Sequence, residues 1–355
     1  MTHHRQRTLR FTTVFFVLAL AAATGASAQP WGTFFGTSPQ GSHGYVEIGS
    51  SAALNPTGAF TFEAWVWERE FSAGEDCRSI AGKNYTQAWW VGFCTVGGKR
   101  VLRSYLKGSG SARNGGEIPP DQWVHIAVTF DGAHRRHYVD GELVAEFAET
   151  GPLATSTSNV RFFSDVSWRH TPSGFLREVR IWNVARSLSG LRALINKNVT
   201  APQAGLIGVW PLSGNAQNIV GPYDGSIGGT GDFFSYAAAN NCTTGTNRVC
   251  FSGRFQTSVA WRTNTGSTGV GTLVPGYSSD SANFWFFFAS NWELLVKTVN
   301  GCGLNSRHWI FYAPVTDVHY KIFVYDADED VIRIFFGYQG LTQGATDTDA
   351  FNTCP

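Results

Sequence analysis

The chain is poor in methionine and in charge of either sign. Met occurs once in 355 residues, and charged residues make up 15% of them. Lys and Arg number 27 against 26 Asp and Glu, which gives a formal net charge of +1. A near-neutral, lightly charged chain has no electrostatic footprint for a phosphate backbone or for anionic lipid. The composition therefore predicts no nucleic-acid partner.

Several signatures of enzymes and of zinc sites are absent as well. The chain contains no G-x-S-x-G nucleophile elbow, no H-E-x-x-H helix, no P-loop and no Rossmann glycine fingerprint. Its cysteines form no C-x-x-C pair, and no His/Cys spacing typical of zinc occurs. These absences favour a chain without catalytic activity. A catalytic pair supplied by distant strands would leave no such motif and stays an alternative.

The N-terminus has the three parts of a secretory signal peptide. Residues 5–10 contain three arginines, residues 11–23 are apolar, and Ala26-Ser27-Ala28 is a small-residue cleavage sequence. The apolar run is too short to span a bilayer, so no membrane span is predicted. After cleavage near Ala28, 24 basic residues (27 less 3) face 26 acidic ones. We expect the mature chain to be secreted or extracellular, with the periplasm and the cell surface as alternatives.

Six cysteines remain in a chain bound for an oxidising compartment, which predicts disulfides. Several pairings are possible in principle. Proximity along the chain favours Cys77–Cys94 in the N-terminal part. It also favours Cys242–Cys250, which would close a short loop, and Cys302–Cys354, which would tie down the C-terminus.

Residues 123–147 contain the strongest local structural signal. Asp131-Gly132 and Asp140-Gly141 each lie at the edge of an alternating apolar run. Asp-Gly between such runs indicates a β-hairpin, because the tight turn needs a positive φ that Gly adopts without strain. The stretch predicts three successive antiparallel strands, which need a facing sheet to bury their apolar side chains.

Further strands are predicted wherever apolar residues alternate. Before residue 228 these runs cover 45–48, 60–68, 89–93, 101–106, 160–163, 175–182, 206–212 and a short segment near 227. One helix is expected over 187–197, with Ser187 as its cap. Many short strands separated by turns indicate an all-β sandwich rather than a parallel α/β sheet.

Residues 228–247 are rich in Gly, Ala, Asn and Thr and have no lasting periodicity, which marks a domain boundary. Beyond it, alternating runs at 255–262, 284–288, 292–299, 309–313, 318–325 and 331–336 predict a second, smaller antiparallel β-sandwich. The expected organisation is a signal peptide over 1–28, an N-terminal segment over 29–42, a domain over 43–228, a linker over 229–249 and a domain over 250–355.

Residues 43–228 resemble the laminin G-like, or concanavalin A-like, jelly-roll family. The matching pieces are YVEIG, FTFEAWVW, QWVHIAVTFDG, YVDGELV, FLREVRIWNVARS and GLIGVWPL. The resemblance implies an antiparallel jelly-roll β-sandwich and, commonly, binding of glycans or proteins outside the cell. Residues 250–355 resemble a module that recurs at the C-terminal end of exported bacterial proteins, through GRFQTSVAW, SANFWFFFASNWELLVKTVNGC and AFNTCP. That second resemblance implies a secreted bacterial setting and no assigned activity.

Calcium is the one cofactor that the first resemblance suggests, because some relatives bind Ca²⁺ at the rim of the sandwich. Many relatives carry an Asp where this chain has Ser42-His43-Gly44, and Ile-Asp-Glu where it has Leu176-Arg177-Glu178. We therefore assign no calcium ligands. Related glucanases place an acid and a nucleophile on one strand in an E-x-D-x-E pattern, and this chain has no such triplet.

The candidate ligand-binding residues are Trp89, Trp90, Trp168, Arg169 and His170. Adjacent tryptophans in a strand point to opposite faces, so either Trp89 or Trp90 could face outward. The other three lie in a predicted loop. Sugar sites place an aromatic ring beneath the apolar face of the sugar, while Arg, His or Asn satisfy its hydroxyls. Packing within the sandwich is the alternative for each.

His125 and two polar segments are interpreted as structural rather than functional. His125 lies inside a strand and is expected to be packed and hydrogen-bonded. The segment 134–137, His-Arg-Arg-His, is interpreted as a solvated basic turn. The acidic segment 326–330 is interpreted as an exposed hairpin turn, because a calcium loop needs Gly at its sixth position, where this chain has Val331.

The favoured hypothesis is a secreted, non-catalytic binding protein that recognises an extracellular glycan or glycoprotein through its lectin-like jelly roll. The first alternative is a polysaccharide-acting hydrolase on the same scaffold. The second is a structural protein that mediates surface attachment. Two carboxylates about 5–10 Å apart in an open groove would favour the hydrolase, and a large exposed apolar patch would favour the structural role.

Overall fold

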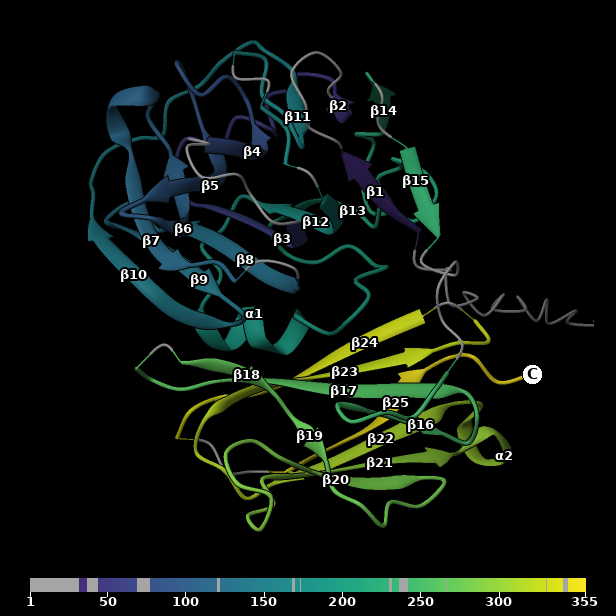
Figure 1. Ribbon diagram of the computed structural model, residues 1–355. Helices are drawn as coiled ribbons and strands as arrows, with labels where there is room; N and C mark the ends of the chain where they lie inside the picture. Colours follow the sequence, from purple (N-terminus) through teal and green to yellow (C-terminus); the bar gives the residue numbers. More distant parts are fainter. Residues whose placement is uncertain are drawn as a thin grey trace, which may run out of the picture.

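The computed structural model describes residues 32–36, 44–68, 77–119, 122–167, 170–172, 174–229, 232–235, 242–265, 267–329, 331–340 and 344–355. Most elements in these ranges are strands, and they form four antiparallel sheets (Figure 1). The predicted signal peptide, Trp168 and Arg169 lie outside these ranges. Within them no helix has the length and hydrophobicity to cross a bilayer.

The first module, residues 32–235, is a sandwich of two sheets. Sheet 1 consists, in spatial order, of β10 (Glu142–Ala148), β9 (His134–Val139), β8 (Trp123–Phe130), β3 (Phe60–Glu68), β12 (Gly174–Trp182), β1 (Gly32–Gly36) and β15 (Asp232–Ser235), with β13 (Leu206–Trp210) also paired to β12. Sheet 2 consists of β14 (Gly225–Gly228), β2 (Tyr45–Ile48), β11 (Val160–Phe162), β4 (Cys77–Gly82), β5 (Trp90–Val96), β6 (Lys99–Tyr105) and β7 (Arg113–Glu117). A 3₁₀ turn, η1 (Ser109–Ser111), joins β6 to β7. The predicted antiparallel jelly-roll sandwich is confirmed.

The two predicted hairpins organise one end of sheet 1. β8 pairs with β9, and β9 pairs with β10. Asp140 and Gly141 both have positive φ, 52° and 71°, which is the backbone of the tight turn that Asp-Gly favours. The alternating sequence thus produces three strands whose inner face packs in the core.

The core of the first module lies between its two sheets. Phe60, Phe62, Trp89 and Ile126 are fully or almost fully buried there, and the Trp89 ring lies 5.3 Å from that of Phe60. The predicted helix is present as α1 (Leu188–Leu194) after β12, and the hydroxyl of Ser187 accepts a hydrogen bond from the Gly190 amide at 3.1 Å.

The second module, residues 242–355, is a smaller sandwich with its own core. Sheet 3 consists of β16 (Arg248–Phe251), β17 (Phe255–Arg262), β23 (His319–Asp326) and β24 (Val331–Gly337), with β18 (Thr268–Val270) also paired to β17. Sheet 4 consists of β19 (Thr272–Leu273), β20 (Ser281–Trp285), β21 (Leu294–Asn300), β22 (His308–Pro314) and β25 (Ala345–Phe351). A one-turn helix, α2 (Cys302–Asn305), follows β21. Phe251, Phe284 and Ile322 are fully buried between the sheets.

The N-terminal segment and the linker each contain a strand that the sequence analysis does not predict. β1 lies in the N-terminal segment and β15 in the linker, and they pair with each other at the edge of sheet 1. Each is short, so neither offers the several alternations that identify a strand from sequence. The exact domain boundaries remain a prediction.

The three expected disulfides are confirmed. Cys77–Cys94 joins β4 to β5, Cys242–Cys250 closes a short loop before β17, and Cys302–Cys354 ties the C-terminus to α2. The structure describes all six cysteines, and none is free.

The modules meet through the outer faces of sheets 1 and 3. In Figure 1 sheet 3 faces the first module and sheet 4 lies on the far side. The contact is apolar at β24, where Phe336 stacks on Trp65 with ring centroids 5.7 Å apart and Ile334 is buried beside them. The Arg192 guanidinium of α1 lies over the Tyr338 ring, 3.7 Å from the ring centre. We call this region the closed end of the interface.

Candidate functional site: a groove between the two modules

At β17 the two modules separate and leave a groove of about 940 Å³, which we call the inter-module groove. Its second-module side is formed by the outward positions of two strands. These are Gln256, Ser258, Ala260 and Arg262 of β17 and His319, Lys321, Phe323 and Tyr325 of β23. Between them, Val259, Tyr320, Ile322 and Val324 are buried in the core of the second module, so the period-two pattern of each strand largely separates core from groove.

The first module contributes tryptophan to the opposite side. Trp67 at the end of β3 and Trp123 at the start of β8 are direct cross-strand neighbours on the outer face of sheet 1, and both line the groove. Trp123 is buried, whereas Trp67 is only half-buried and its ring lies 5.2 Å from that of Phe175. Among the first-module tryptophans that the structure describes, Trp67 alone is not buried.

A buried ion pair crosses the interface beside the groove. Lys321 Nζ lies 3.0 Å from Asp140 Oδ2 and donates a hydrogen bond to the Trp123 carbonyl at 3.0 Å. Asp140 Oδ1 also accepts from the His125 amide at 2.9 Å. Burial lowers the pKa of Lys321, and the Asp140 carboxylate opposes that shift.

Apart from Arg248, the other charged side chains of the groove pair with an opposite charge. Glu142 of β10 contacts Arg262 and lies 3.5 Å from His319 Nδ1. Burial acts to raise the pKa of Glu142, but the hydrogen bond and charge of His319, with Arg262, bring it below the usual range. Glu117 pairs with Lys99 at 2.7 Å. Arg248 is exposed at the rim and donates to the carbonyl and the hydroxyl of Thr243, each at 3.1 Å.

Neutral polar side chains of the groove are uncommitted. Gln122, Gln256 and Ser258 are all half-buried lining residues, and their side chains make no hydrogen bond within the described chain. Amides and hydroxyls can donate and accept, so they suit a ligand that also does both. The groove combines aromatic surface with neutral hydrogen-bonding groups.

The described candidate residues from the sequence, Trp89, Trp90 and His170, do not line this groove. Trp89 and Trp90 are both buried, at 2% and 1% exposure. They do point to opposite faces: Trp89 packs on Phe60 in the core, while Trp90 donates from Nε1 to Ser79 Oγ at 2.8 Å and packs edge-on against Tyr105. The expectation that one of them faces solvent is wrong, because both faces of β5 are covered at this point.

The predicted binding loop is only partly described. Trp168 and Arg169 lie outside the described residues, and His170 is exposed, with its carbonyl accepting from the Ser79 amide at 2.8 Å. His170 is not among the described residues that line the groove. The role of all three in ligand contact remains a prediction.

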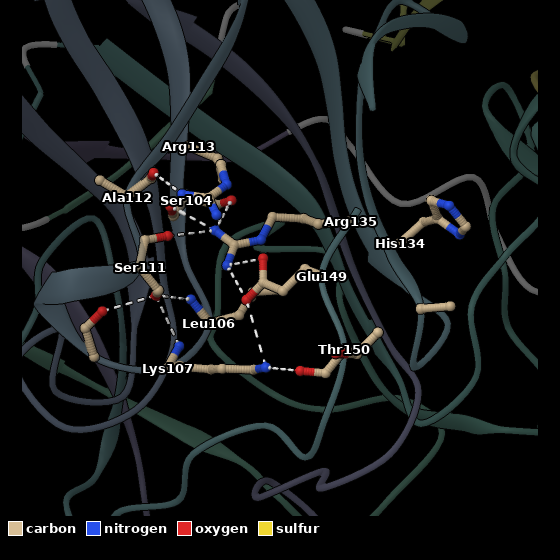
Figure 2. Close-up of polar contacts among 12 residues, drawn as sticks. Ser104, Leu106, Lys107, Ser111, Ala112, Arg113, His134, Arg135, Glu149 and Thr150 are labelled. Carbon is tan, nitrogen blue, oxygen red and sulfur yellow. Dashed lines mark hydrogen bonds and ion pairs between the residues drawn. The ribbon is translucent and has the colours of Figure 1, made fainter. Parts of the chain in front are cut away.

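The basic segment 134–137 is a strand and not a solvated turn, so that interpretation is wrong. In β9 Arg135 and His137 point inward and are fully buried, while His134 lies apart from this cluster (Figure 2). Arg135 donates to the carbonyls of Ser104 and Ser111 at 2.9 Å and pairs with Glu149 at 2.5 Å. The charges that the sequence places together are separated by the period of the strand.

This buried cluster contains a serine–histidine pair that resembles a nucleophile and its base. Ser104 Oγ lies 2.7 Å from His137 Nε2. Burial and the nearby Arg135 charge lower the pKa of His137 to about 3, so the imidazole is neutral. Because Ser104 and His137 are both fully buried, a substrate cannot reach the hydroxyl in this structure. The pair therefore has a structural role.

The two other structural interpretations are confirmed in outline. His125 is buried, with Nε2 3.2 Å from Glu63 Oε2. The described part of the acidic segment, residues 326–329, lies at the turn between β23 and β24, although its first residue, Asp326, is buried rather than exposed. Arg254 binds both Asp326 oxygens, at 2.6 and 2.7 Å, so a guanidinium takes the place that a cation would need.

At the second position where the sequence departs from the family pattern, residues 176–178, the charged side chains do not form a set of calcium ligands. Arg177 lies 4.7 Å from the Trp123 ring, and Glu178 pairs with Arg180 at 3.1 Å. Ser42 and His43 lie outside the described residues. Elsewhere in the described chain Cys302, His308 and Cys354 are close enough to hold a metal, but the two sulfurs are joined in a disulfide and are not thiolate ligands.

Sequence reasoning missed the groove because its two sides come from segments far apart in the chain. In the sequence, Trp67 is one position of the alternating run 60–68, and nothing local marks it as part of a site. The useful signal was the polar character of the outward positions in β17, which sits beside aromatic residues in β23. That signal identifies a face but not what lies opposite to it.

Comparison with known proteins identifies a family to which most of the first module is similar. Residues 40–190 match the laminin G-type family described as the concanavalin A-like lectin/glucanases superfamily. β13 and β14 lie beyond that match and complete the sandwich. No curated protein sequence matches the chain.

Three solved structures illustrate the likeness. A candidate carbohydrate-binding protein of Bacteroides ovatus is 19% identical with a TM-score of 0.47, and the match covers 57% of this chain and 60% of that one. The match thus covers less than two thirds of that protein. A pentraxin of Limulus polyphemus is 11% identical with a TM-score of 0.44, covering 58% of this chain and 94% of that one. The sialyllactose-bound CBM40 domain of a Ruminococcus gnavus sialidase is 12% identical with a TM-score of 0.34, covering 45% and 96%. Values this low carry no functional argument.

Proposed function

We propose that this chain is a secreted, non-catalytic carbohydrate-binding protein whose ligand occupies the inter-module groove. The supporting observation is the arrangement of its two sides. Tryptophan from the first module lies across from uncommitted amide and hydroxyl groups of the second module. Aromatic rings pack on the apolar faces of sugars, and amides and hydroxyls exchange hydrogen bonds with sugar hydroxyls.

The fold and its position support this assignment. The first module has the fold of a superfamily that includes lectins. Ligand sites also occur preferentially where two domains meet, because the junction supplies a concave surface. Secretion is supported by the predicted signal peptide and by three disulfides, which persist in oxidising compartments.

The carboxylates of the groove support a role without catalysis. Glycoside hydrolysis needs one carboxyl group as acid and a second as nucleophile or base. Glu117 and Asp140 line the groove, but the first pairs with Lys99 and the second with Lys321. Asp140 is thus held by a buried cation, and Glu117 forms an exposed pair with its cation.

A glycan array followed by calorimetry tests the proposal. The purified mature chain is expected to bind at least one glycan class without cleaving it. Ser258→Tyr places a bulky ring in the groove from a strand position that points away from the core, so the chain should fold and lose binding. Trp67→Ala removes the half-buried ring and should weaken binding about tenfold, in line with the loss of one aromatic contact.

Trp292→Ala serves as the matched control. Trp292 is 53% exposed and is not among the groove residues, so this variant should bind like the unaltered chain. Circular dichroism and thermal melting verify the fold of all three variants. Unchanged binding in Ser258→Tyr and Trp67→Ala would exclude the groove, and turnover of any bound glycan would exclude a non-catalytic role.

A further inference from the structure

We infer that the ligand of the inter-module groove is an uncharged, hydroxyl-rich oligosaccharide and not an acidic one. This inference rests on the proposed function and specifies its substrate class. It follows from which side chains of the groove already have partners and which do not.

The lining charges are satisfied within the protein. Lys321 pairs with Asp140 at 3.0 Å, Arg262 contacts Glu142, and Glu117 pairs with Lys99 at 2.7 Å. An acidic sugar would have to compete with Asp140 or Glu142 for these cations. It would also have to approach those carboxylates, and like charges at short distance repel each other.

Arg248 is a further cation of the groove and lies at its rim. Arg248 has no carboxylate partner in the described chain, but it is exposed and donates twice to Thr243 at 3.1 Å. An exposed guanidinium attracts an anion only weakly, because solvent and salt screen the charge. Arg248 therefore does not turn the groove into an anion site.

The groups left open toward the ligand are neutral. Gln122, Gln256 and Ser258 combine donors and acceptors and make no other side-chain hydrogen bond within the described chain. A sugar hydroxyl also donates and accepts, whereas a carboxylate or sulfate only accepts. A carboxylate or sulfate placed against the two glutamines could not donate to their carbonyl oxygens, whereas a hydroxyl at the same place could.

The test compares uncharged and acidic oligosaccharides on the same full chain. Neutral glucan, xylan, mannan and galactan fragments form one arm, and uronate and sialylated fragments form the other. We expect neutral fragments to bind with an affinity that changes less than about twofold between roughly 50 and 500 mM NaCl, because no net charge is screened. Gln256→Ala should lower that affinity by up to about tenfold through the lost hydrogen bonds.

Arg248→Gln distinguishes the two ligand classes. If the ligand is neutral, this variant should bind within about twofold of the unaltered chain, because only a rim charge is removed. Binding of acidic fragments alone, weakened by salt and by Arg248→Gln but still blocked by Ser258→Tyr, would overturn this inference and leave the proposed function intact. Binding of neither class would overturn both.

Discussion

Two clusters of buried charge in this chain have the same chemistry but different surroundings. Inside the jelly roll, Arg135 pairs with Glu149 among β6, η1 and β9 (Figure 2). Between the modules, Lys321 pairs with Asp140 beside the inter-module groove. The first cluster is enclosed, so it can only hold strands and turns together. The second borders open space, so the same kind of pair also determines what the groove presents to a ligand.

The difference shows that burial, and not residue type, separates structural from functional polar groups here. Ser104 and His137 have the chemistry of a nucleophile and a base, yet both are fully buried. Gln256 and Ser258 have ordinary chemistry, yet they lie open in a groove. Four predictions test this comparison.

The largest effect is expected inside the jelly roll. Glu149→Gln leaves the fully buried Arg135 guanidinium without its charged partner, and breaking a buried pair in this way costs about 3–5 kcal/mol. Urea denaturation of the full chain measures the loss. The control is Glu146→Gln, which breaks the partly exposed pair with Arg136 at 3.0 Å and should cost less than about 1 kcal/mol. Equal losses of unfolding free energy in the two variants would contradict the conclusion that the buried Arg135–Glu149 pair stabilises the jelly roll.

A smaller loss is expected at the interface. Lys321→Met keeps the length of the side chain but leaves Asp140 buried without its cation, for a cost of about 3 kcal/mol. The loss should be below that of Glu149→Gln, because Asp140 keeps its hydrogen bond from the His125 amide. If Lys321→Met were as stable as the unaltered chain, the pair would contribute nothing to holding the modules together.

The third effect depends on pH and belongs to His137. Its folded pKa of about 3 is lower than the ordinary 6.5 of an unfolded histidine. Below pH 6.5 the unfolded chain therefore binds a proton that the folded chain does not, and stability falls as pH falls from 6.5 toward 3. At about 1.4 kcal/mol per pH unit, the loss between pH 6.5 and 5 is about 2 kcal/mol. His137→Gln should remove this slope, and a slope unchanged in that variant would show that another group causes it.

The smallest effect on stability is expected at the groove itself. Gln256→Ala removes a half-buried side chain without hydrogen-bond partners, so the free energy of unfolding should change by less than about 0.5 kcal/mol. Gln256→Ala should thus lower the ligand affinity while leaving the free energy of unfolding almost unchanged. A loss above about 2 kcal/mol would show that Gln256 supports the fold, and would weaken its assignment to ligand binding.

Much of the fold could be predicted from the sequence. Asp131-Gly132 and Asp140-Gly141 specify their hairpins locally, because each turn needs a positive φ between alternating strands. The three disulfides follow from proximity along the chain. β25 was not predicted, because Ala345–Phe351 is mostly polar and pairs only with β22 in sheet 4.

The candidate site could not be predicted in the same way. Trp89 and Trp67 both occur in alternating strands, and no local pattern distinguishes the ring that is buried from the ring that borders a groove. Likewise Arg135 and Arg136 are adjacent in sequence, but the strand period directs one inward and one outward.

By itself the sequence determined most of the long alternating strands, the two Asp-Gly turns and which cysteines pair, because these depend on neighbours along the chain. Only the tertiary structure decided that sheet 1 and sheet 3 meet at β24 and part at β17. Apolar Ile334 and Phe336 exclude water at one end, and the polar residues Gln256 and Ser258 leave space at the other. Which surface lies opposite each strand depends on contacts between residues far apart in the chain, and the local sequence does not indicate these contacts.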